Sequence, residues 1–542
     1  MNVLMIYPKF NGRGFWNTSS IAKKFGHRRP TQPALGLLTI ASYLPDDFKI
    51  RLVDRNVTEE SESDLQWADI VFLSLMNAQI GDYHHCVLRA KEYRKPIAVG
   101  GPFTHAYPEV VAADADWVCF GEAEDIMNEF IDDLRADRRG KRYQGGNATN
   151  MEQVRMPRFD LLMPLSEYDV MPIQFSRGCP FQCEFCDIIE IYGRVPRTKT
   201  PYQVIAELAY LKSLGFKGII SLVDDNFIGN KRKAKLLLDH IAAWNRNEGS
   251  PFSFVTEASI NLADDEELLR KMAAANLDGV FIGIETPDEN LLKATKKIQN
   301  LGGNALEKLR KIRECGIHIA AGFIIGFDGE DHEIFERQRS FIQASGIGVS
   351  MLGFLVAIPH TQLSRRLEEE GRLLKNLTCL ATEQTIDGIN FVPKGKLSKR
   401  EYFSNYVELL SKLYEPNSFF ERIVPALLSL KRKSNLQSGL KPLFSHFAMV
   451  ARFFCVMGFL NRGARRRFWK TFFTIVRKNP AALGAFYHDC FHFYHLRKHA
   501  HYVRQKISTY LSNPSPDDVL DEFIPMDART DAVEMKAFAA SS

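Results

Sequence analysis

Long hydrophobic runs are missing from this chain of 542 residues. A membrane-spanning helix needs about 18 consecutive apolar residues. The best candidate, residues 448–460, is short and carries Arg452. The first residues, Met1–Tyr7, have no basic segment and no small-residue cleavage site, so they predict a strand and not a signal peptide. These absences exclude an integral membrane protein and favour a cytoplasmic one.

Other signatures are absent as well. There is no Walker run and no G-x-G-x-x-G run, and no period of 20–50 residues indicates a solenoid. Nine cysteines are an odd number in a long chain, which argues against a secreted disulfide framework. What remains is globular composition, with 45% hydrophobic and 25% charged residues.

Acidic residues are scarce in one segment. Residues 421–510 contain 17 Lys or Arg but only Glu421 and Asp489 as acids, a local net charge of +15, while the whole chain carries +5. Residues 511–542 are acidic. Charge segregated in this way predicts a separate, basic C-terminal module.

The first 140 residues alternate short apolar runs with helical patterns. This alternation predicts βαβ units, hence a doubly wound parallel sheet of Rossmann type with ligands beyond the carboxyl ends of its strands. The expected strands are Val3–Tyr7, Ile50–Val53, Ile70–Leu75, Ile97–Val99 and Trp117–Phe120, and the expected helices are Leu35–Leu44 and Tyr83–Arg94.

A second alternating series follows. About six βα units predict an α/β barrel or partial barrel, whose reactive groups gather at the carboxyl ends of the strands. The expected strands are Ile173–Ser176, Gly218–Val223, Phe252–Thr256, Gly279–Ile284, His318–Ile325 and Gly348–Val356, with helices at Pro201–Leu214, Lys231–Asn245 and Asp265–Ala274. From about Ser398 the pattern is helical and aromatic.

The chain therefore divides into five expected segments, all in an α/β protein with a helical end. They are the first Rossmann-like domain at 1–137, a linker at 138–172, the partial barrel at 173–395, a basic helical domain at 396–515 and an acidic mobile tail at 516–542.

Three of the nine cysteines fall within eight residues, directly after a predicted strand. Cys179, Cys183 and Cys186 have a C-x3-C-x2-C spacing, and thiolates so spaced can converge on one metal centre from a single loop. A structural zinc site usually has four protein ligands, and no fourth Cys or His lies nearby. A four-iron cluster with three cysteine ligands keeps one iron open for a cofactor or substrate.

This motif after the first strand of an α/β barrel resembles the radical S-adenosylmethionine (radical SAM) enzymes, over residues 173–360. Residues 322–330 resemble the family's GxIxGxxGE strand and loop, and 283–286 the strand whose polar end meets the SAM ribose. Residues 223–227 depart from the family's Gly-Gly-Glu run, although their carboxylates suit the SAM ammonium. The resemblance implies SAM contacts at Phe185, Asp224, Asp225, Glu257, Glu285, Gly322, Ile324 and Gly326, with a [4Fe–4S] cluster on the three cysteines.

In the first domain, Ser74 and Gly100-Gly101 stand at adjacent strand ends, where they leave room for a broad ligand. With Gly121-Glu122 they resemble the cobalamin (vitamin B12)-binding domains fused to many radical SAM barrels. The resemblance implies cobalamin contacts at Ser74, Gly100, Gly101 and Glu122. The Asp-x-His-x-x-Gly motif that supplies a histidine to cobalt is absent, so we expect no protein ligand to cobalt or a degenerate scaffold. His27, His84, His85 and His105 fit surface or core roles better.

The resemblance implies reductive cleavage of SAM and, with cobalamin, methylation of an unactivated carbon in a small-molecule or lipid substrate. A flavodoxin or ferredoxin would supply the electron. The alternatives are a cobalamin-dependent cyclase or oxidative rearrangement enzyme, and a non-catalytic iron–sulfur and cobalamin sensor. Tyr414-Glu415-Pro416 and residues 224–230 resemble the subgroup of the hopanoid C-2 methylase.

The basic module has three open interpretations. It is a helical cap over the barrel, a peripheral contact at the inner membrane surface, or a nucleic-acid contact, which the missing reader motif disfavours.

Overall fold

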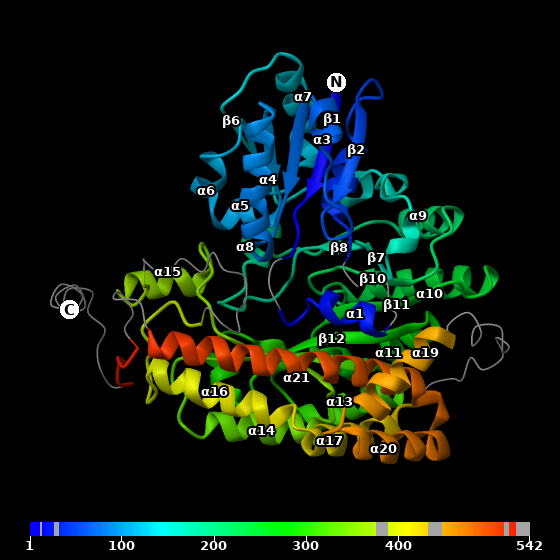
Figure 1. Ribbon diagram of the computed structural model, residues 1–542, viewed down its shortest axis with the longest axis vertical. Helices are drawn as coiled ribbons and strands as arrows, with labels where there is room; N and C mark the ends of the chain where they lie inside the picture. Colours follow the sequence, from blue (N-terminus) through cyan, green and yellow to red (C-terminus); the bar gives the residue numbers. More distant parts are fainter. Residues whose placement is uncertain (11–13, 26–31, 375–387, 432–446, 514–519, 527–542) are drawn as a thin grey trace.

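Three layers follow one another along the longest axis of the computed structural model (Figure 1). The structure describes residues 1–10, 14–25, 32–374, 388–431, 447–513 and 520–526. The N-terminal α/β domain lies at one end, the second sheet lies in the middle, and the C-terminal helices form the far layer.

The first domain is a six-stranded parallel sheet in the order β2-β1-β3-β4-β5-β6, with helices on both faces. Leu4 and Ile6 of β1 belong to one apolar cluster and Val3 and Met5 to the other, so both faces are buried, as in a doubly wound sheet. The strands are β1 (Asn2–Tyr7), β2 (Lys49–Asp54), β3 (Ile70–Ser74), β4 (Ile97–Gly100), β5 (Trp117–Phe120) and β6 (Lys141–Gln144). The helices are α2 (Leu35–Ala41), α3 (Glu62–Trp67), α4 (Ile80–Glu92), α5 (Pro102–Ala106), α6 (Pro108–Ala112) and α7 (Met127–Arg135).

The segment expected to be a linker contains a strand of this sheet. β6 pairs with β5 at the sheet edge, and of its four residues only Tyr143 is buried. An edge strand with one buried side chain has almost no apolar pattern, which is why the sequence did not predict it. The expectation of a linker beginning at residue 138 is corrected accordingly.

The second domain is the predicted partial barrel, with six parallel strands in the order β14-β13-β12-β11-β10-β7. The strands are β7 (Val170–Ile173), β10 (Ile219–Leu222), β11 (Ser253–Ala258), β12 (Leu277–Glu285), β13 (His318–Ile325) and β14 (Val349–Phe354). The helices are α8 (Ile188–Tyr192), α9 (Pro201–Ser213), α10 (Lys231–Asn247), α11 (Glu266–Ala274), α12 (Glu289–Ala294), α13 (Ala305–Glu314), α14 (Ile334–Ser345) and α15 (Gln362–Glu369).

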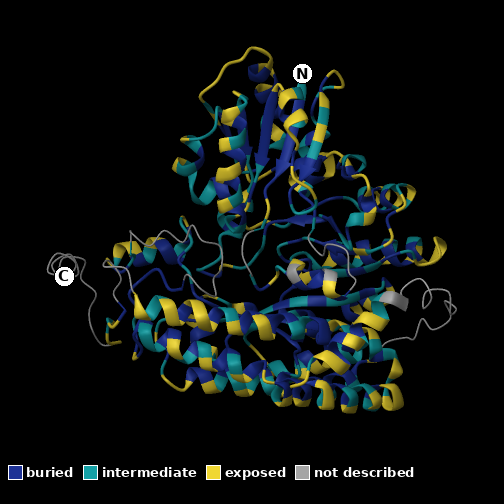
Figure 2. Cartoon of the chain, viewed as in Figure 1, coloured by how far each residue is buried: buried dark blue, intermediate teal, exposed yellow. Residues whose placement is uncertain are grey.

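The C-terminal helices pack on the barrel and share its apolar core. Tyr406 and Tyr414 are buried and donate hydrogen bonds to the carbonyls of Leu352 and Ser350 on β14, at 2.8 and 2.6 Å. Figure 2 shows this buried layer between the sheet and the exposed outer faces of the helices. The helices are α16 (Lys399–Leu413), α17 (Pro416–Ser429), α19 (Phe447–Phe454), a π-helical turn (Cys455–Leu460), α20 (Arg465–Lys478) and α21 (Leu483–Ser512). In the described part of the chain, no helix is long and apolar enough to cross a membrane.

An arm from the first domain, residues 14–25, reaches the other two layers. It contains α1 (Ser19–Phe25), which lies beside α21 and in front of β12 in Figure 1. His495 of α21 lies 2.8 Å from the carbonyl oxygen of Phe15, and the ring of Trp16 contacts Phe281 of β12. The arm therefore ties the first domain to the barrel and to α21.

Part of the tail expected to be mobile is packed. Leu520 is buried, Asp521 forms an ion pair with Arg400 at 2.5 Å, and Ile524 donates a backbone hydrogen bond to Pro393. The expectation of a mobile tail is corrected for residues 520–526; residues 516–519 and 527–542 lie outside the described residues.

Candidate functional site

The three clustered cysteines lie on a loop closed by a short antiparallel pair, β8 (Ser176–Arg177) and β9 (Arg197–Thr198). Gly178 begins the loop with φ of 89°, and a Cβ there would lie 3.0–3.1 Å from three carbonyl oxygens of the loop. Only glycine fits such a close left-handed turn without strain. The loop therefore starts and ends at one place, at the carboxyl end of β7.

The loop folds so that its thiols share one environment. The backbone N–H of Cys186 donates to the carbonyl of Cys183, and that of Cys179 donates to Gly193, both at 3.2 Å. Burial raises the pKa of the Cys179 and Cys186 thiols, and the charge of nearby Cys183 raises both further. Three cysteine thiolates carried on one loop are a ligand set that a four-iron cluster takes, which fits the predicted cluster.

Polar side chains from outside the cysteine loop contact these sulfurs. Gln299 Nε2 donates to Cys183 Sγ at 3.2 Å, and Asn226 Nδ2 lies 4.0 Å from Cys179 Sγ. The Lys297 ammonium is buried nearby, and its pKa is raised against the effect of burial, by Glu285 first and by Cys183 next. Donors around sulfur stabilise the electron-rich state of an iron–sulfur cluster.

The cysteine loop is fastened to the loop after β13 by ion pairs. Arg366 of α15 forms ion pairs at 2.9 Å with both Glu184, on the cysteine loop, and Asp328, after β13. The rings of Phe185 and Phe327 lie 6.0 Å apart between them. The predicted aromatic residue and the predicted Gly-rich loop are therefore brought together.

A hydrogen bond inside the Gly-rich loop fixes its conformation. Gly326 has φ of 113°, and its N–H donates to the buried Glu330 carboxylate at 2.8 Å. Burial raises the pKa of Glu330 to about 8. Gly322 and Ile324 lie on the face of β13 opposite the buried Ala321 and Phe323, so they line the inside of the barrel.

The end of β12 carries a strained acidic residue. Glu285 has φ of 65°, in the left-handed region, and its carboxylate pairs with Lys297 at 2.6 Å. The pair lies over Gly283, where a Cβ would meet Glu285 Oε1 at 2.4 Å and Lys297 Nζ at 2.9 Å. Gln338 holds the Glu285 carbonyl through a hydrogen bond of 2.9 Å. Strain retained by surrounding contacts is typical of ligand sites.

Three carboxylates gather at the ends of β10 and β11. Asp224 accepts from the N–H groups of Phe175 and Ser176 at 2.8 and 2.6 Å, and its other oxygen is buried without a hydrogen bond. Burial raises the pKa of Asp224 to about 7, that of Asp225 to about 6 and that of Glu257 to about 7.

Glu257 lies on the face of β11 opposite the buried Thr256 and Ala258. Its side chain is exposed, yet desolvation is the largest cause of its raised pKa. In the described part of the chain, neither Asp225 nor Glu257 is in an ion pair. A cationic ligand such as an ammonium would satisfy these acids.

The first domain presents its small residues toward the barrel. Ser74 and Gly100 are paired at the ends of β3 and β4, and Gly101 follows with φ of 97°. A Cβ at Gly101 would meet Ser74 Oγ at 2.7 Å, whereas at Gly100 it would make an ordinary contact of 3.8 Å. The predicted residues therefore form one narrow strip at the carboxyl edge of the sheet.

Glu122, expected to contact cobalamin, also has a role in joining the two domains. It is buried, and its carboxylate accepts from Arg177 at 3.1 Å and Arg197 at 2.7 Å, the residues that flank the cysteine loop. Glu124 also pairs with Arg177, at 2.5 Å. Glu122 is therefore a positioning residue that joins the first domain to the cysteine loop.

The four candidate histidines are dispersed. His105 lies at the boundary of the two domains, with its ring 5.5 Å from that of His360, and its Nε2 is buried without a hydrogen bond. His84 lies 3.8 Å from Asp114, and His85 is exposed on α4. His27 lies outside the described residues.

Sequence reasoning missed the residues that connect these pieces. Lys297, Gln299, Gln338 and Arg366 stand far along the chain from the cysteines and carry no local motif. Arg177 could have been predicted as a site residue, because it stands directly before Gly178 and the cysteine motif.

Comparisons with known proteins agree with this arrangement. Residues 25–131 match the B12 binding domain, residues 173–342 match the radical SAM superfamily, and residues 361–509 match a domain of unknown function, DUF4070. An uncharacterized methyltransferase of Synechocystis is 39% identical over 96% of each chain. The hopanoid C-2 methylase of Rhodopseudomonas palustris is 36% identical over 72% of each chain.

Solved structures share the fold. Cobalamin-dependent OxsB superposes with a TM-score of 0.57 at 15% identity, covering 100% of this chain and 83% of the other. TsrM from Kitasatospora setae superposes with a TM-score of 0.55 at 17% identity, covering 68% of this chain and 78% of the TsrM chain. The chain belongs to the radical SAM superfamily, among its cobalamin-dependent methyltransferases. Its cofactors are a [4Fe–4S] cluster, SAM and cobalamin.

Proposed function

We propose that the protein methylates a carbon atom of a lipid substrate at a membrane surface. One observation carries this proposal: the carboxyl edge of the first sheet faces the cysteine loop, and Glu122 joins the two through Arg177 and Arg197. When bound, the cluster, SAM and cobalamin supply the one-electron and methyl-transfer chemistry. A one-electron donor of flavodoxin or ferredoxin type would supply the reducing equivalent.

The residues of this chain bind and orient. Cys179, Cys183 and Cys186 would hold the cluster. Asp225 and Glu257 would attract the SAM ammonium, because both acids lack an ion pair within the described residues. Other contacts would come from Phe185, Asp224, Glu285, Gly322, Ile324 and Gly326 for SAM, and from Ser74, Gly100 and Gly101 for cobalamin.

Two observations support a lipid as the substrate: the name of a similar enzyme and an exposed apolar surface of this chain. The hopanoid C-2 methylase is named for methylation of a hopanoid, a lipid. In this chain, the outer face of α20 and the π-helical turn before it expose apolar side chains: Phe459 (64%), Leu460 (62%) and Phe473 (62%).

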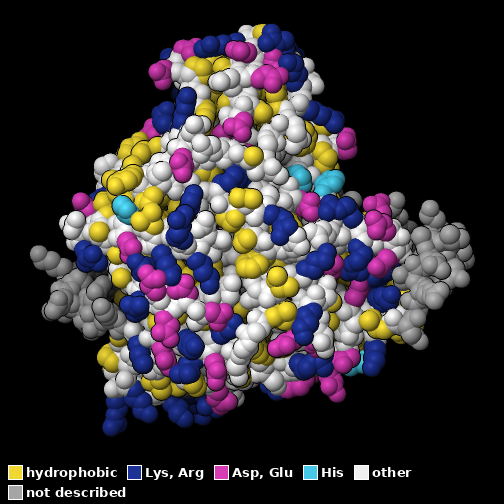
Figure 3. Space-filling view, turned by 180° about the vertical axis from the view of Figure 1, so that it is seen from behind, with side chains coloured by type: hydrophobic (Ala, Val, Ile, Leu, Met, Phe, Trp, Pro, Cys, Tyr) yellow, Lys and Arg dark blue, Asp and Glu magenta, His cyan; other side chains and the backbone are white. Residues whose placement is uncertain are grey.

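Basic residues surround these apolar side chains. Arg466, Lys470, Phe473 and Arg477 follow at helical spacing on α20 and are all exposed. Within the described residues none of the three basic ones forms an ion pair. Figure 3 shows Lys and Arg gathered along the lower edge of the molecule, on the side that α20 occupies, with apolar side chains above them. Apolar groups rimmed by basic ones suit an anionic membrane surface.

The methylation test uses anaerobically reconstituted protein with SAM that carries a deuterated methyl group, and membrane lipid extract. We expect mass spectrometry to find a lipid that gains the labelled methyl group, and to find none with Cys183→Ala. The lipid assignment would be overturned if SAM is cleaved but the labelled methyl group is found only in water-soluble products.

The membrane test compares sedimentation with anionic and neutral vesicles. Each basic residue near the surface contributes about 1 kcal/mol, so replacing Arg466, Lys470 and Arg477 by Gln should weaken binding to anionic vesicles roughly a hundredfold. The matched control replaces the exposed Lys49, Lys217 and Arg232, which lie on other elements. Equal binding by the two triple variants would contradict the proposed surface.

A further inference from the structure

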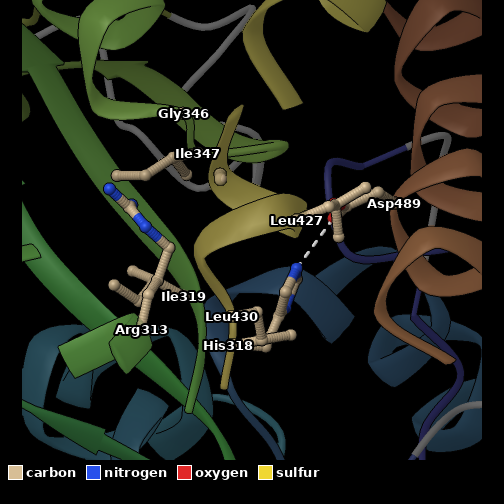
Figure 4. Close-up of a pocket in the computed structure, with 9 residues that line it drawn as sticks. Arg313, His318, Ile319, Gly346, Ile347, Leu427, Leu430 and Asp489 are labelled. Carbon is tan, nitrogen blue, oxygen red and sulfur yellow. Dashed lines mark ion pairs between the residues drawn. The ribbon is translucent and has the colours of Figure 1, made fainter. Parts of the chain in front are cut away.

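A cluster of two histidines and an aspartate lies at the amino end of the barrel strands, away from the cysteine loop. His318 is the first residue of β13, and His488 and Asp489 are consecutive on α21. One ligand atom from each lies within 4.8 Å of the others. Figure 4 shows His318 and Asp489 pointing toward each other from the strand and the helix.

We propose that His318, His488 and Asp489 form a second metal site, which takes a divalent transition metal such as Zn²⁺ and fastens α21 to the base of the barrel. The proposal is independent of the methylation reaction. Two imidazoles and one carboxylate are a ligand set that such ions favour.

The spacing of the ligand atoms suits such an ion. An ion bound at 2.0–2.2 Å in tetrahedral geometry separates its ligand atoms by about 3.3 Å. His318 Nε2 lies 3.0 Å from Asp489 Oδ1, and His488 Nδ1 lies 3.8 Å from the same oxygen. These separations bracket the required value, so small side-chain adjustments would complete the coordination.

The surroundings leave room for the carboxylate and for an ion. Asp489 is buried, and the backbone beneath it is Gly348, where a Cβ would meet the carboxylate oxygens at 2.6 and 3.0 Å. A cavity of about 10 Å³ opens beside His318 and Asp489, about the space that one water-sized sphere occupies. Because position 348 is a glycine, the Asp489 carboxylate can lie against the backbone there.

The third ligand remains accessible. The His488 side chain is 46% exposed, whereas that of His318 is 17% exposed. A metal held here would therefore keep a coordination position toward solvent, where water can bind. Because β13 has eight residues, this site lies about 23 Å along the strand from the Gly-rich loop. It would not compete with the cluster.

A metal at this site would fasten α21 to the barrel more firmly than the His318–Asp489 ion pair alone. α21 packs along α16 and contacts the N-terminal arm through His495. A metal that joins α21 to β13 would fix both against the barrel. A metal that binds only the folded state stabilises it by RT ln(1 + [Zn²⁺]/Kd), so zinc should raise the midpoint of thermal unfolding.

The test uses the iron-loaded full chain, equilibrated with Zn²⁺ and washed, with zinc and iron measured by mass spectrometry. We expect about one zinc per chain, X-ray absorption showing nitrogen and oxygen ligands near 2.0–2.1 Å, and a higher unfolding midpoint. His318→Ala and His488→Ala should each lose most of the zinc while keeping their iron. His488 is half exposed, so its loss should leave the fold intact.

The matched control is His501→Ala, an exposed histidine on the same helix, which should keep the zinc. Zinc retained by both His318→Ala and His488→Ala, or coordinated by sulfur, would place the metal on cysteines and overturn the proposal. Absence of bound zinc in the natural chain at tens of micromolar Zn²⁺ would overturn it as well, and would leave a plain His318–Asp489 ion pair.

Discussion

At the scale of single residues, the site depends on a glycine, whose missing side chain leaves space for other groups. Gly283 has no Cβ, and the Glu285–Lys297 pair occupies the space above it. The pair lies beside Phe185, whose ring is 5.8 Å from the Lys297 ammonium. A methyl group at position 283 therefore changes the geometry of a buried charge pair without removing either charge.

Gly283→Ala should weaken SAM binding by about tenfold, or about 1.4 kcal/mol, and leave cluster iron unchanged. The new Cβ would lie 2.4 Å from Glu285 Oε1, so the carboxylate must leave its place. Equilibrium dialysis with SAM and an iron assay measure the two effects. Gly279→Ala on the same strand is the control, because its nearest contact is 3.3 Å away, at a side-chain methyl of Val255. Equal SAM affinity in both variants would refute the role of the pair.

Replacing Cys179, Cys183 or Cys186 by Ala should remove most of the cluster iron and all SAM cleavage. Each change leaves one iron without its anionic ligand, and the described cysteines elsewhere in the chain are not on this loop. Iron content and 5′-deoxyadenosine formation are the measurements. Cys315→Ala and Cys119→Ala serve as controls and should behave as the natural chain; the reverse pattern would end the assignment.

At the scale of elements, the strand ends concentrate acids that are costly to ionise. Glu257 lies near the end of β11, and its pKa is raised from 4.5 to about 7 by burial first and by Asp225 next. The folded protein therefore keeps this proton at a pH where the unfolded chain has lost it. The resulting destabilisation grows as the pH rises from about 4.5 to 7 and is complete above 7.

Glu257→Gln should therefore raise the unfolding midpoint by a degree or two at pH 7.5 and leave it unchanged at pH 4.5. The effect is small because the side chain meets solvent. The same variant should weaken SAM binding at pH 7.5, since it removes a charge that faces the ammonium. Calorimetry at the two pH values and SAM titration test both. Stabilisation of equal size at both pH values would contradict the assigned titration.

The sequence predicted the elements well where apolar runs are continuous. Val3–Tyr7 and His318–Ile325 became strands within a residue of their expected bounds, because strands buried on both faces carry an unbroken signal. β6 was missed because one buried Tyr143 leaves no pattern. The cysteine loop and the strip from Ser74 to Gly101 could be predicted, since each is a local motif. The ties between them could not, because Arg366 or Gln299 meets its partner only through the fold.

At the scale of the whole molecule, the two cofactor regions are separate domains that meet across one boundary. His105 lies on this boundary with its ring near His360. The Asp-x-His-x-x-Gly motif is missing, so the cobalt should lack a protein nitrogen ligand. A Cβ added at Gly100 would make only ordinary contacts of 3.8 Å within the domain, and we expect a bulky side chain there to occupy the space proposed for cobalamin.

Protein loaded with Co(II) cobalamin should give an electron paramagnetic resonance spectrum without nitrogen coupling from the chain, and His105→Ala should give the same spectrum. Gly100→Phe should abolish uptake of cobalamin, while Lys49→Gln, far from the strip, should bind normally. A nitrogen coupling that disappears in His105→Ala would show that a boundary histidine ligates the cobalt.

The N-terminal arm limits how the first domain can move. A domain held by one linker can swing as a hinged lid and open its ligand face. Here residues 14–25 leave the first domain, pack on Phe281 and α21 and return to it, while Glu122 holds the cysteine loop at a second point. The first domain is therefore held at two points, through residues 14–25 and through Glu122, and both contacts must break before its ligand face can swing away from the cysteine loop.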